Sequence, residues 1–594
     1  MKEKLLWNFK INLDNATQER EEDDESEEVI SDGDDMEEMN DQSAGQPVLS
    51  SESKVLFMFI LLWQTMCKVS DNGITVLLNF LKRFLTLLGT LAKIEVLVNF
   101  AKSIPSTLYM ATMAFGFMQD EFEKFVVCPK CMTIYEFDKC IIKRSNGNVS
   151  IQKCTHVKYP NHPQKRRRVE CGTILMKKVR SKSGSLYLLP KRVYCFKPLV
   201  SSLKSLLSRP GFTEKCEQWR NRNIEEDRMG DVYEGKIWKE FLDSDGKDFF
   251  SKIGNLAVMM NVDWFQPYKH TKYSCGVIYL VIMNLPREER FKFENVLVVG
   301  IIPGPHEPKG NINSFLQPIM SELTDLWDGV IFDERIISGG MRKIKVALLA
   351  ICCDVPAARK CGGFAGHSAT KGCSRCFKSF PRDGFGSKPD FSGFDKDQWE
   401  KRTHDVHRAY AEQTLSANCP TRFKALVRNT GAKYTALLQL PFYDAIRFVV
   451  IDHMHNLFLG IAKHTLKVWM EEGVLNEKDF QILQRRVNAV EPPSEVGKIP
   501  SKIATGFNGF TADQWKNWVC YYSVFAFKEI QLMRKFLRTS QIQQLEWPEE
   551  YKCFGELLVT PVAGTVGEVS IPNEEQRQDK MENCALFSYS RELS

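Results

Sequence analysis

Residues 255–285 read NLAVMMNVDWFQPYKHTKYSCGVIYLVIMNL, and residues 342–356 read RKIKVALLAICCDVP. Four short apolar runs rich in β-branched residues lie in this part of the chain, at 256–262, 276–285, 295–302 and 344–353. Between the third and fourth runs, SFLQPIMSELTDLW carries apolar residues at helical spacing. Short β-rich runs bounded by Pro and Gly predict strands, so the expected order is strand, strand, strand, helix, strand.

Two aspartates follow strands of this predicted sheet. Asp263 ends the first strand and Asp354 ends the fourth. If these strands are neighbours, the two carboxylates face each other across one edge, as a two-metal phosphoryl-transfer site requires. Either Asp alone is explained as well by a strand-end turn. The pair, at matching ends, favours the metal site.

Composition bounds the class of protein. The 594 residues exceed a single core, and 43% hydrophobic with 26% charged residues is typical of globular domains. Residues 1–46 hold 16 acidic and 4 basic residues, a net charge of −12. Because the whole chain has a net charge of +6, residues 47–594 carry a net charge of +18. A basic body suits a polyanionic partner. The 18 cysteines follow no signal-peptide pattern, which favours thiols or metal ligands in a reducing compartment.

The N-terminal part divides in two. Residues 1–53 form an acidic tail with too little apolar surface to fold. Residues 54–120 are strongly apolar, but charges such as Lys82 and Arg83 interrupt every run before ~20 residues. We therefore expect a helical region and no membrane span.

A cysteine cluster follows at 121–196, the expected zinc-binding module. Cys128 and Cys131 form a CxxC knuckle, which presents two thiolates as tetrahedral zinc requires. Cys154 and Cys171 are the preferred second pair. His156, His162 and Cys140 remain alternatives.

A basic run lies inside this module. Lys165, Arg166, Arg167 and Arg168 are consecutive. They fit contacts to nucleic-acid phosphates. A nuclear localisation signal fits them equally, and a solvated loop is as plausible as both together.

Six ordered segments resemble the transposases of CACTA/Plavaka-type DNA transposons and the transposase-domain proteins derived from them. The segments are DVYEGKIWKEF (231–241), NVDWFQPYKHTKYSCGVIYLVIMNLPREER (261–290), VGIIPGPHEPKGNINSFLQP (299–318), CCDVPAARKCGGFAGHSATKGCSRC (352–376), DHMHNLFLGIAKHTLKVW (452–469) and GFTADQWKNW (509–518). The resemblance extends over roughly residues 128–527.

The resemblance implies an α/β fold with an RNase H-like catalytic core and an acid triad. The zinc module and a helical linker (197–250) then precede the first part of the core (251–360). An insertion domain (361–505), the last core helix (506–535) and a divergent tail (536–594) follow. Asp231, in the linker, could add a metal ligand but more plausibly packs beside the first strand.

The resemblance also implies further site residues. It carries over Cys373, Cys376 and His455 as a second zinc set, with His367 as a possible addition. Asp452 is either the N-cap of the helix that follows or a catalytic acid, and the cap ranks first.

Asp513 is the preferred third acid. The family carries an acid in this short A-x-x-W segment, in some members one residue later, where this chain has Gln514. Thr511 and Gln514 also have capping-box spacing, which alone explains an Asp in the first helical turn.

Together these features predict a nuclear DNA transposase that cuts and joins DNA by two-metal phosphoryl transfer. Its expected cofactors are catalytic Mg²⁺ or Mn²⁺ and structural Zn²⁺. Its expected partners are DNA and further copies of itself, with no membrane. The alternative is a domesticated, catalytically inactive DNA-binding or protein-interaction protein.

Overall fold

The computed structural model describes residues 28–29, 51–67, 69–108, 110–111, 122–143, 149–180, 186–222, 230–268, 271–308, 312–332, 342–380, 400–492, 496 and 500–527. Most of the acidic tail and the whole C-terminal tail therefore lie outside the described residues. The chain divides into two compact units, one comprising 1–122 with 176–190, the other 123–175 with 191–594.

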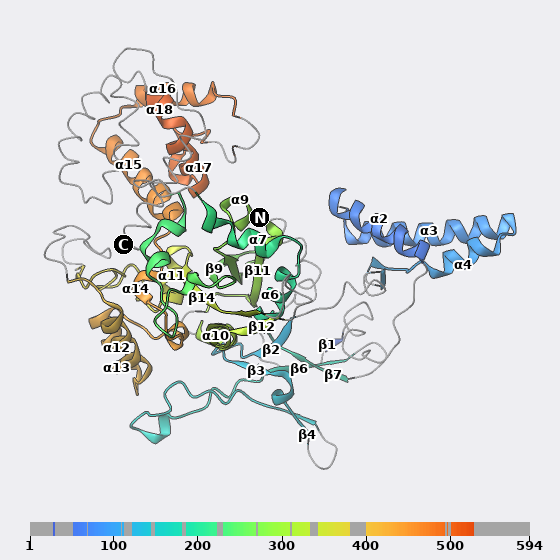
Figure 1. Ribbon diagram of the computed structural model, residues 1–594, viewed down its shortest axis with the longest axis horizontal. Coiled ribbons are helices and arrows are strands. Elements are labelled where there is room, and N and C mark those ends of the chain that lie inside the picture. Colours follow the sequence, from blue (N-terminus) through green and yellow to red (C-terminus); the bar gives the residue numbers. More distant parts are fainter. Residues whose placement is uncertain are drawn as a thin grey trace. The chain divides into compact units, whose positions relative to one another are not determined.

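A seven-stranded mixed sheet forms the centre of the second unit, in the order β14-β9-β10-β11-β8-β2-β3 (Figure 1). Its strands are β2 (Glu123–Val127), β3 (Ile134–Glu136), β8 (Val193–Phe196), β9 (Leu256–Phe265), β10 (Cys275–Ile282), β11 (Val296–Ile302) and β14 (Val346–Ile351). β9, β10 and β11 are antiparallel neighbours, while β14 pairs with β9 in parallel. The chain is thus a mixed α/β protein.

The predicted order of elements is confirmed. The three antiparallel strands, helix α10 (Asn313–Asp328) and β14 follow one another as expected, and the first and fourth strands are neighbours. β14 is parallel to β9 because α10 lies between the third and fourth strands and carries the chain back across the sheet. A tight turn would have produced another antiparallel pair.

The sheet extends beyond these four strands into the predicted zinc module. β8 pairs with the outer edge of β11, and β2 then pairs with β8. An open strand edge is a liability that proteins cover. The cysteine-bearing segment is therefore joined to the core through continuous backbone hydrogen bonds, a connection that side-chain periodicity does not indicate.

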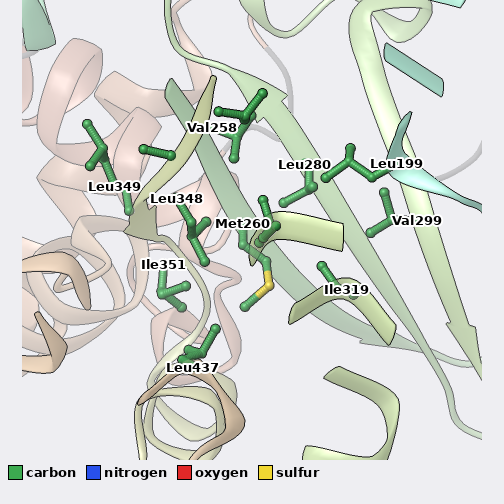
Figure 2. Packing of buried hydrophobic residues seen from close by; sticks show 14 of the residues in the cluster. Leu199, Val258, Met260, Leu280, Val299, Ile319, Leu348, Leu349, Ile351 and Leu437 are labelled. Carbon is green, nitrogen blue, oxygen red and sulfur yellow. The ribbon is translucent and has the colours of Figure 1, made fainter. Parts of the chain in front are cut away.

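One large hydrophobic core fills the space between the sheet and its helices (Figure 2). Val258 and Met260 of β9 and Ile319 of α10 are all fully buried in this core. Tyr194 of β8 donates a hydrogen bond from its hydroxyl to the Phe315 carbonyl, at 2.9 Å. By strand alternation, Asn261 and Asp263 lie on the other face of β9.

Helices and short strands complete this unit. They include α6 (Leu199–Leu207), α7 (Phe212–Glu217), α8 (Lys236–Glu240), α9 (Arg287–Arg290), α11 (Val355–Gly362), α12 (His404–Leu415), α13 (Pro420–Thr430), α14 (Ala445–Phe448), β4 (Ile141–Lys143), β5 (Val149–Ile151), β12 (Val330–Phe332) and β13 (Arg342–Ile344). A second hydrophobic cluster joins η9 (Met454–Ala462), α15 (Lys463–Glu471), α16 (Glu477–Asn488), α17 (Ala512–Asn517), η11 (Trp518–Tyr522) and α18 (Ser523–Phe527).

The first unit contains α2 (Ser51–Cys67), α3 (Asp71–Ala92) and α4 (Glu95–Ser103). It also holds a small sheet of β1 (Glu28–Val29), β6 (Met176–Arg180) and β7 (Leu186–Pro190). By length and composition alone, Asn72–Ala92 is apolar enough to cross a membrane, with a mean hydropathy of 1.5. The sequence-based expectation differed because Lys82 and Arg83 interrupt this helix.

Candidate functional site

Asp263 lies near the carboxyl end of β9, two residues before the strand ends at Phe265. It pairs with Val277 of β10 and is half-buried. Its negative charge adds to burial in raising the pKa of Tyr279 to about 12, which places the carboxylate near the next strand's ring.

Asp354 is the N-cap of α11, directly after β14. Its Oδ1 accepts a hydrogen bond from the Ala357 backbone N–H at 2.8 Å. The cap fixes the side chain at the sheet edge, next to the N-terminus of the helix. Asp354 therefore has the capping role that a strand-end residue often has. One capping bond through Oδ1 does not prevent the carboxylate from binding a metal ion as well.

Backbone register brings the two acids to one level. Ile351 of β14 is aligned with Met260 of β9, and the Cys352 N–H donates to the Met260 carbonyl at 2.9 Å. Three residues further along each chain lie Asp354 and Asp263. The alignment concerns the backbone, and the facing of the two carboxylates stays a prediction.

A third segment continues the same register on the other side of β14. Val449 forms a parallel bridge with Ile351, and the Val450 N–H donates to the Ile351 carbonyl at 2.9 Å. Three residues beyond Val449 is Asp452. Asp263 therefore lies on, and Asp354 and Asp452 follow, three adjacent parallel segments at the same level, although among the described residues their carboxylate oxygens form no three-residue group within 4.8 Å.

Electrostatics support this position for Asp452. Burial raises the pKa of Cys352 to about 11, and the charge of Asp452 contributes to the rise. Asp452 Oδ1 accepts from the Met454 N–H at 2.9 Å, and Oδ2 lies in a short contact with His455 Nδ1. His455, proposed from the resemblance as a zinc ligand, thus contacts a carboxylate at the sheet edge.

Trp264 follows Asp263 on β9. Its ring lies across Gly276 of β10, where an added Cβ would overlap the indole, so only glycine fits. The Lys360 Nζ of α11 lies 5.4 Å from the Trp264 ring centre and also pairs with Glu307. These contacts hold α11, and with it Asp354, against β9. Sequence reasoning did not identify Trp264 or Lys360.

Asp513 lies in the first turn of α17. The capping box expected there is present, with Thr511 and Gln514 bonded reciprocally. α17 packs into the second hydrophobic cluster through Trp515. Burial raises the pKa of Cys520, about two turns further along, and the charge of Asp513 contributes to the rise. Its role as third acid stays a prediction.

The four preferred cysteines of the first cluster come together. Ligand atoms of Cys128, Cys131, Cys154 and Cys171 all lie within 4.8 Å of one another. The Cys128–Cys171 and Cys131–Cys154 sulfur distances are 3.7 and 3.4 Å. Tetrahedral zinc with bonds of about 2.3 Å separates its sulfurs by about 3.8 Å. The cluster therefore fits zinc closely.

The alternative ligands lie elsewhere. Cys140 donates toward the Glu136 carbonyl, and His162 Nδ1 accepts the Gln164 N–H at 3.0 Å. Burial raises the pKa of Cys154, whereas hydrogen bonds from Thr173 and the neighbouring thiols outweigh burial and lower that of Cys171 to about 7. Four thiolates this close repel one another, and a bound cation removes that repulsion.

The basic run lies on the surface of the same loop. Lys165, Arg166 and Arg167 form the short helix η3 (Lys165–Arg167) and are exposed, as is Arg168. Arg168 Nε donates to the His162 carbonyl at 2.8 Å, which ties the run to the cysteine-bearing loop. These four side chains are accessible to a phosphate group.

Cys373 and Cys376 lie next to a buried arginine. Arg402 Nε donates to the carbonyls of Cys373 and Cys376, at 3.0 and 3.1 Å. A hydrogen bond from Cys376, aided by the Arg402 charge, lowers the pKa of Cys373 to about 6. In the described part of the chain, neither His455 nor His367 joins this pair to form a three-residue metal group. A second zinc site stays a prediction.

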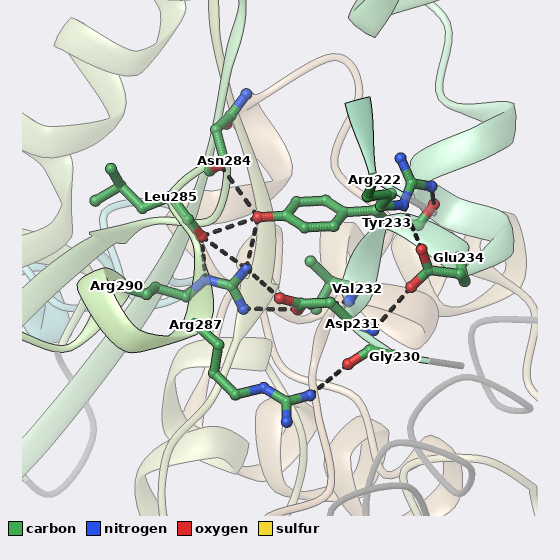
Figure 3. A network of polar contacts seen from close by, with 10 residues as sticks. All are labelled: Arg222, Gly230, Asp231, Val232, Tyr233, Glu234, Asn284, Leu285, Arg287 and Arg290. Carbon is green, nitrogen blue, oxygen red and sulfur yellow. Dashed lines mark hydrogen bonds and ion pairs between the residues drawn. The ribbon is translucent and has the colours of Figure 1, made fainter. Parts of the chain in front are cut away.

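Asp231 belongs to a buried structural network (Figure 3). Its two carboxylate oxygens accept from Arg290 Nη1 and Nη2 at 2.8 and 2.9 Å. Tyr233 adds hydrogen bonds from its hydroxyl to the carbonyls of Asn284 and Leu285. The network connects residues 230–234 to Asn284 and Leu285, which follow β10. Both carboxylate oxygens of Asp231 are bound to Arg290, so Asp231 has a structural role here.

Part of the chain is similar to a known protein family. Residues 227–420 match the model of transposase family tnp2. The matched family is one of transposases. No curated protein matches the chain.

The matched region, residues 227–420, includes Asp263, Asp354 and the Cys373–Cys376 pair. The first cysteine cluster, Asp452 and Asp513 lie outside it.

Proposed function

We propose that this chain is a DNA transposase of the DDE/D type, with an RNase H-like core, that cuts and joins DNA by metal-dependent phosphoryl transfer. The observation that carries the proposal is the common level of Asp263, Asp354 and Asp452 on three adjacent parallel segments. The match of residues 227–420 to a transposase family supports the substrate class.

The three carboxylates would hold two Mg²⁺ or Mn²⁺ ions. Hard divalent ions prefer a few carboxylates together with water and substrate phosphates, and this donor set fits that preference. When bound, the ions would activate the attacking oxygen and stabilise the leaving oxygen.

The protein's own residues hold the acids in position. The α11 cap orients Asp354, and His455 together with the Met454 N–H orients Asp452. Preorganised charges of this kind stabilise a transition state without rearranging during the reaction. In this proposal Asp452 is the third acid, and Asp513, which the sequence favoured, is the competing candidate.

The surrounding elements fit a DNA-binding protein of the nucleus. Lys165, Arg166, Arg167 and Arg168 would contact backbone phosphates, and zinc held by the four cysteines would fix the loop that carries them. Contacts of this type position the protein without reading sequence.

Metal-dependent nicking of supercoiled DNA tests the proposal. We expect Asp263→Asn, Asp354→Asn and Asp452→Asn each to lower the rate by about 100-fold or more, the usual cost of removing one stabilising group. Asp325→Asn, on the exposed side of α10, is the matched control and should leave the rate unchanged.

The outcome for DNA binding separates the two functions considered. Salt-dependent DNA binding without nicking, in either Mg²⁺ or Mn²⁺, identifies a catalytically inactive DNA-binding protein. Nicking that survives Asp452→Asn but is lost in Asp513→Asn reassigns the third acid to α17.

A further inference from the structure

The helical part of the first unit exposes more large apolar side chains than it buries. Fifteen between Val55 and Met110 are 38–81% exposed, whereas the hydrophobic cluster of these helices has seven buried members. Its four exposed aromatics alone leave on the order of 400 Å² in water, at ~150–250 Å² per ring. The largest patch on a typical monomer is ~300–600 Å² in total.

The exposed residues of α3 form one continuous seam. Phe80, Phe84, Leu87 and Leu91 are 60, 47, 60 and 76% exposed. Their spacing of four, three and four residues is the a/d pattern of helices that pack side by side. The opposite face of α3 carries Ile74 and Leu78, which are fully buried within the unit.

The seam is complementary to itself. A four-three-four spacing reads the same in both directions, so an antiparallel second copy places Phe80 opposite Leu91 and Phe84 opposite Leu87. This is the symmetry of a two-fold interface, in which residue i meets j and j meets i. Arg83 would lie level with Leu88 of the second copy, so the two arginines stay about 7.5 Å apart along the axis.

Charge makes a membrane the less suitable occupant. Lys82 and Arg83 fall at the middle of Asn72–Ala92, where a charged side chain is costly to place in a bilayer. Lys82 is moreover engaged within the unit, donating to Ser106 Oγ at 3.3 Å.

We propose that the exposed α3 seam is a dimerisation surface on which α3 of a second copy of this chain packs antiparallel. The exposed residues Val55, Phe59, Leu62 and Met66 of α2 have the same spacing and enlarge the apolar area available to the dimer. A stable interface buries ~800 Å² per partner, so the dimer needs apolar area beyond the four side chains of the α3 seam. This inference is independent of the catalytic proposal.

Sedimentation velocity of the full chain tests the inference, with Phe84→Glu/Leu87→Glu as the variant. The wild type should sediment at twice 68.3 kDa and the variant at 68.3 kDa. The matched control is Phe291→Glu/Leu415→Glu, whose side chains are also 47 and 60% exposed but lie outside α3. It should remain dimeric.

A charge-complementation experiment guards against simple misfolding. Because residue 84 faces residue 87 of the second copy, Phe84→Lys/Leu87→Lys mixed with Phe84→Glu/Leu87→Glu should restore the dimer. A monomeric wild type, dimers that persist in the variant, or a failed mixture of two folded variants would overturn the inference. Seam-dependent flotation of a monomeric chain with phosphatidylcholine–phosphatidylserine vesicles would assign the seam to a membrane instead.

Discussion

Arg375 donates a hydrogen bond from Nη2 to the carbonyl oxygen of Val449, at 2.9 Å. Arg375 lies between the two cysteines of the Cys373–Cys376 knuckle, and Val449 is the residue whose bridge to Ile351 sets the level of Asp452. The knuckle thus contacts the segment that leads to the proposed third acid.

Arg375→Met should therefore lower the nicking rate. A hydrogen bond from a charged group contributes ~1.5–3 kcal/mol, and 1.4 kcal/mol corresponds to a factor of ten. We expect a loss of about tenfold in kcat, with DNA affinity unchanged. Arg408→Met, which removes an exposed pair with Glu412, is the control and should have no effect. An equal loss in both variants would show that Arg375 does not act through Asp452.

Zinc content reports on the first cysteine cluster. Cys131→Ser should reduce the zinc bound per chain by one equivalent, measured by plasma mass spectrometry, because three thiols hold zinc far more weakly than four. Cys140→Ser should keep the full complement, since Cys140 bonds the Glu136 carbonyl outside the cluster. Loss of zinc in Cys140→Ser with retention in Cys131→Ser would reverse the assignment.

The buried pair of Asp231 and Arg290 should matter for stability. Asp231→Ala leaves the Arg290 guanidinium, which is 5% exposed, without its carboxylate, at a cost of ~3–5 kcal/mol. The measurement is urea unfolding followed by tryptophan fluorescence. Glu136→Ala, which breaks the exposed pair with Lys139, should cost under ~1 kcal/mol. Similar costs for the two variants would contradict a structural role for the network in Figure 3.

His407 should make the fold sensitive to acid. Burial, with the nearby Arg402 charge, lowers the pKa of His407 to about 3, against ~6.5 in the unfolded chain. Between these values the unfolded chain binds one more proton, so the free energy of unfolding falls as the pH falls, by ~1.4 kcal/mol per unit. His407→Phe should flatten this dependence below pH ~6.5. An unchanged slope would place the acid sensitivity elsewhere.

The sequence predicted the central strands because their signal is local. The apolar runs at 256–262, 276–285 and 295–302 correspond to β9, β10 and β11, and the helical spacing at 314–327 corresponds to α10. Alternating and helical burial leave their period in the chain itself. Joining β8 and β2 to this sheet depends on backbone hydrogen bonds between distant segments, and these leave no period.

The site was predictable in part for the same reason. Asp263 and Asp354 lie at the ends of clear apolar runs, so their placement on neighbouring strands could be predicted from strand order. Asp452 follows a single parallel bridge of Val449, a segment too short to be identified as a strand from its sequence. Asp452 does accept the capping hydrogen bond from the Met454 N–H. Because capping alone explained this aspartate, there was no reason in the sequence to expect it level with the two other acids.

Anomalous scattering from Mn²⁺ in crystals of the chain with DNA tests the central claim most directly. We expect two ions about 3.5–4 Å apart, bound by Asp263, Asp354 and Asp452. Ions coordinated by Asp513 in place of Asp452, or no ion at Asp263 and Asp354, would contradict it.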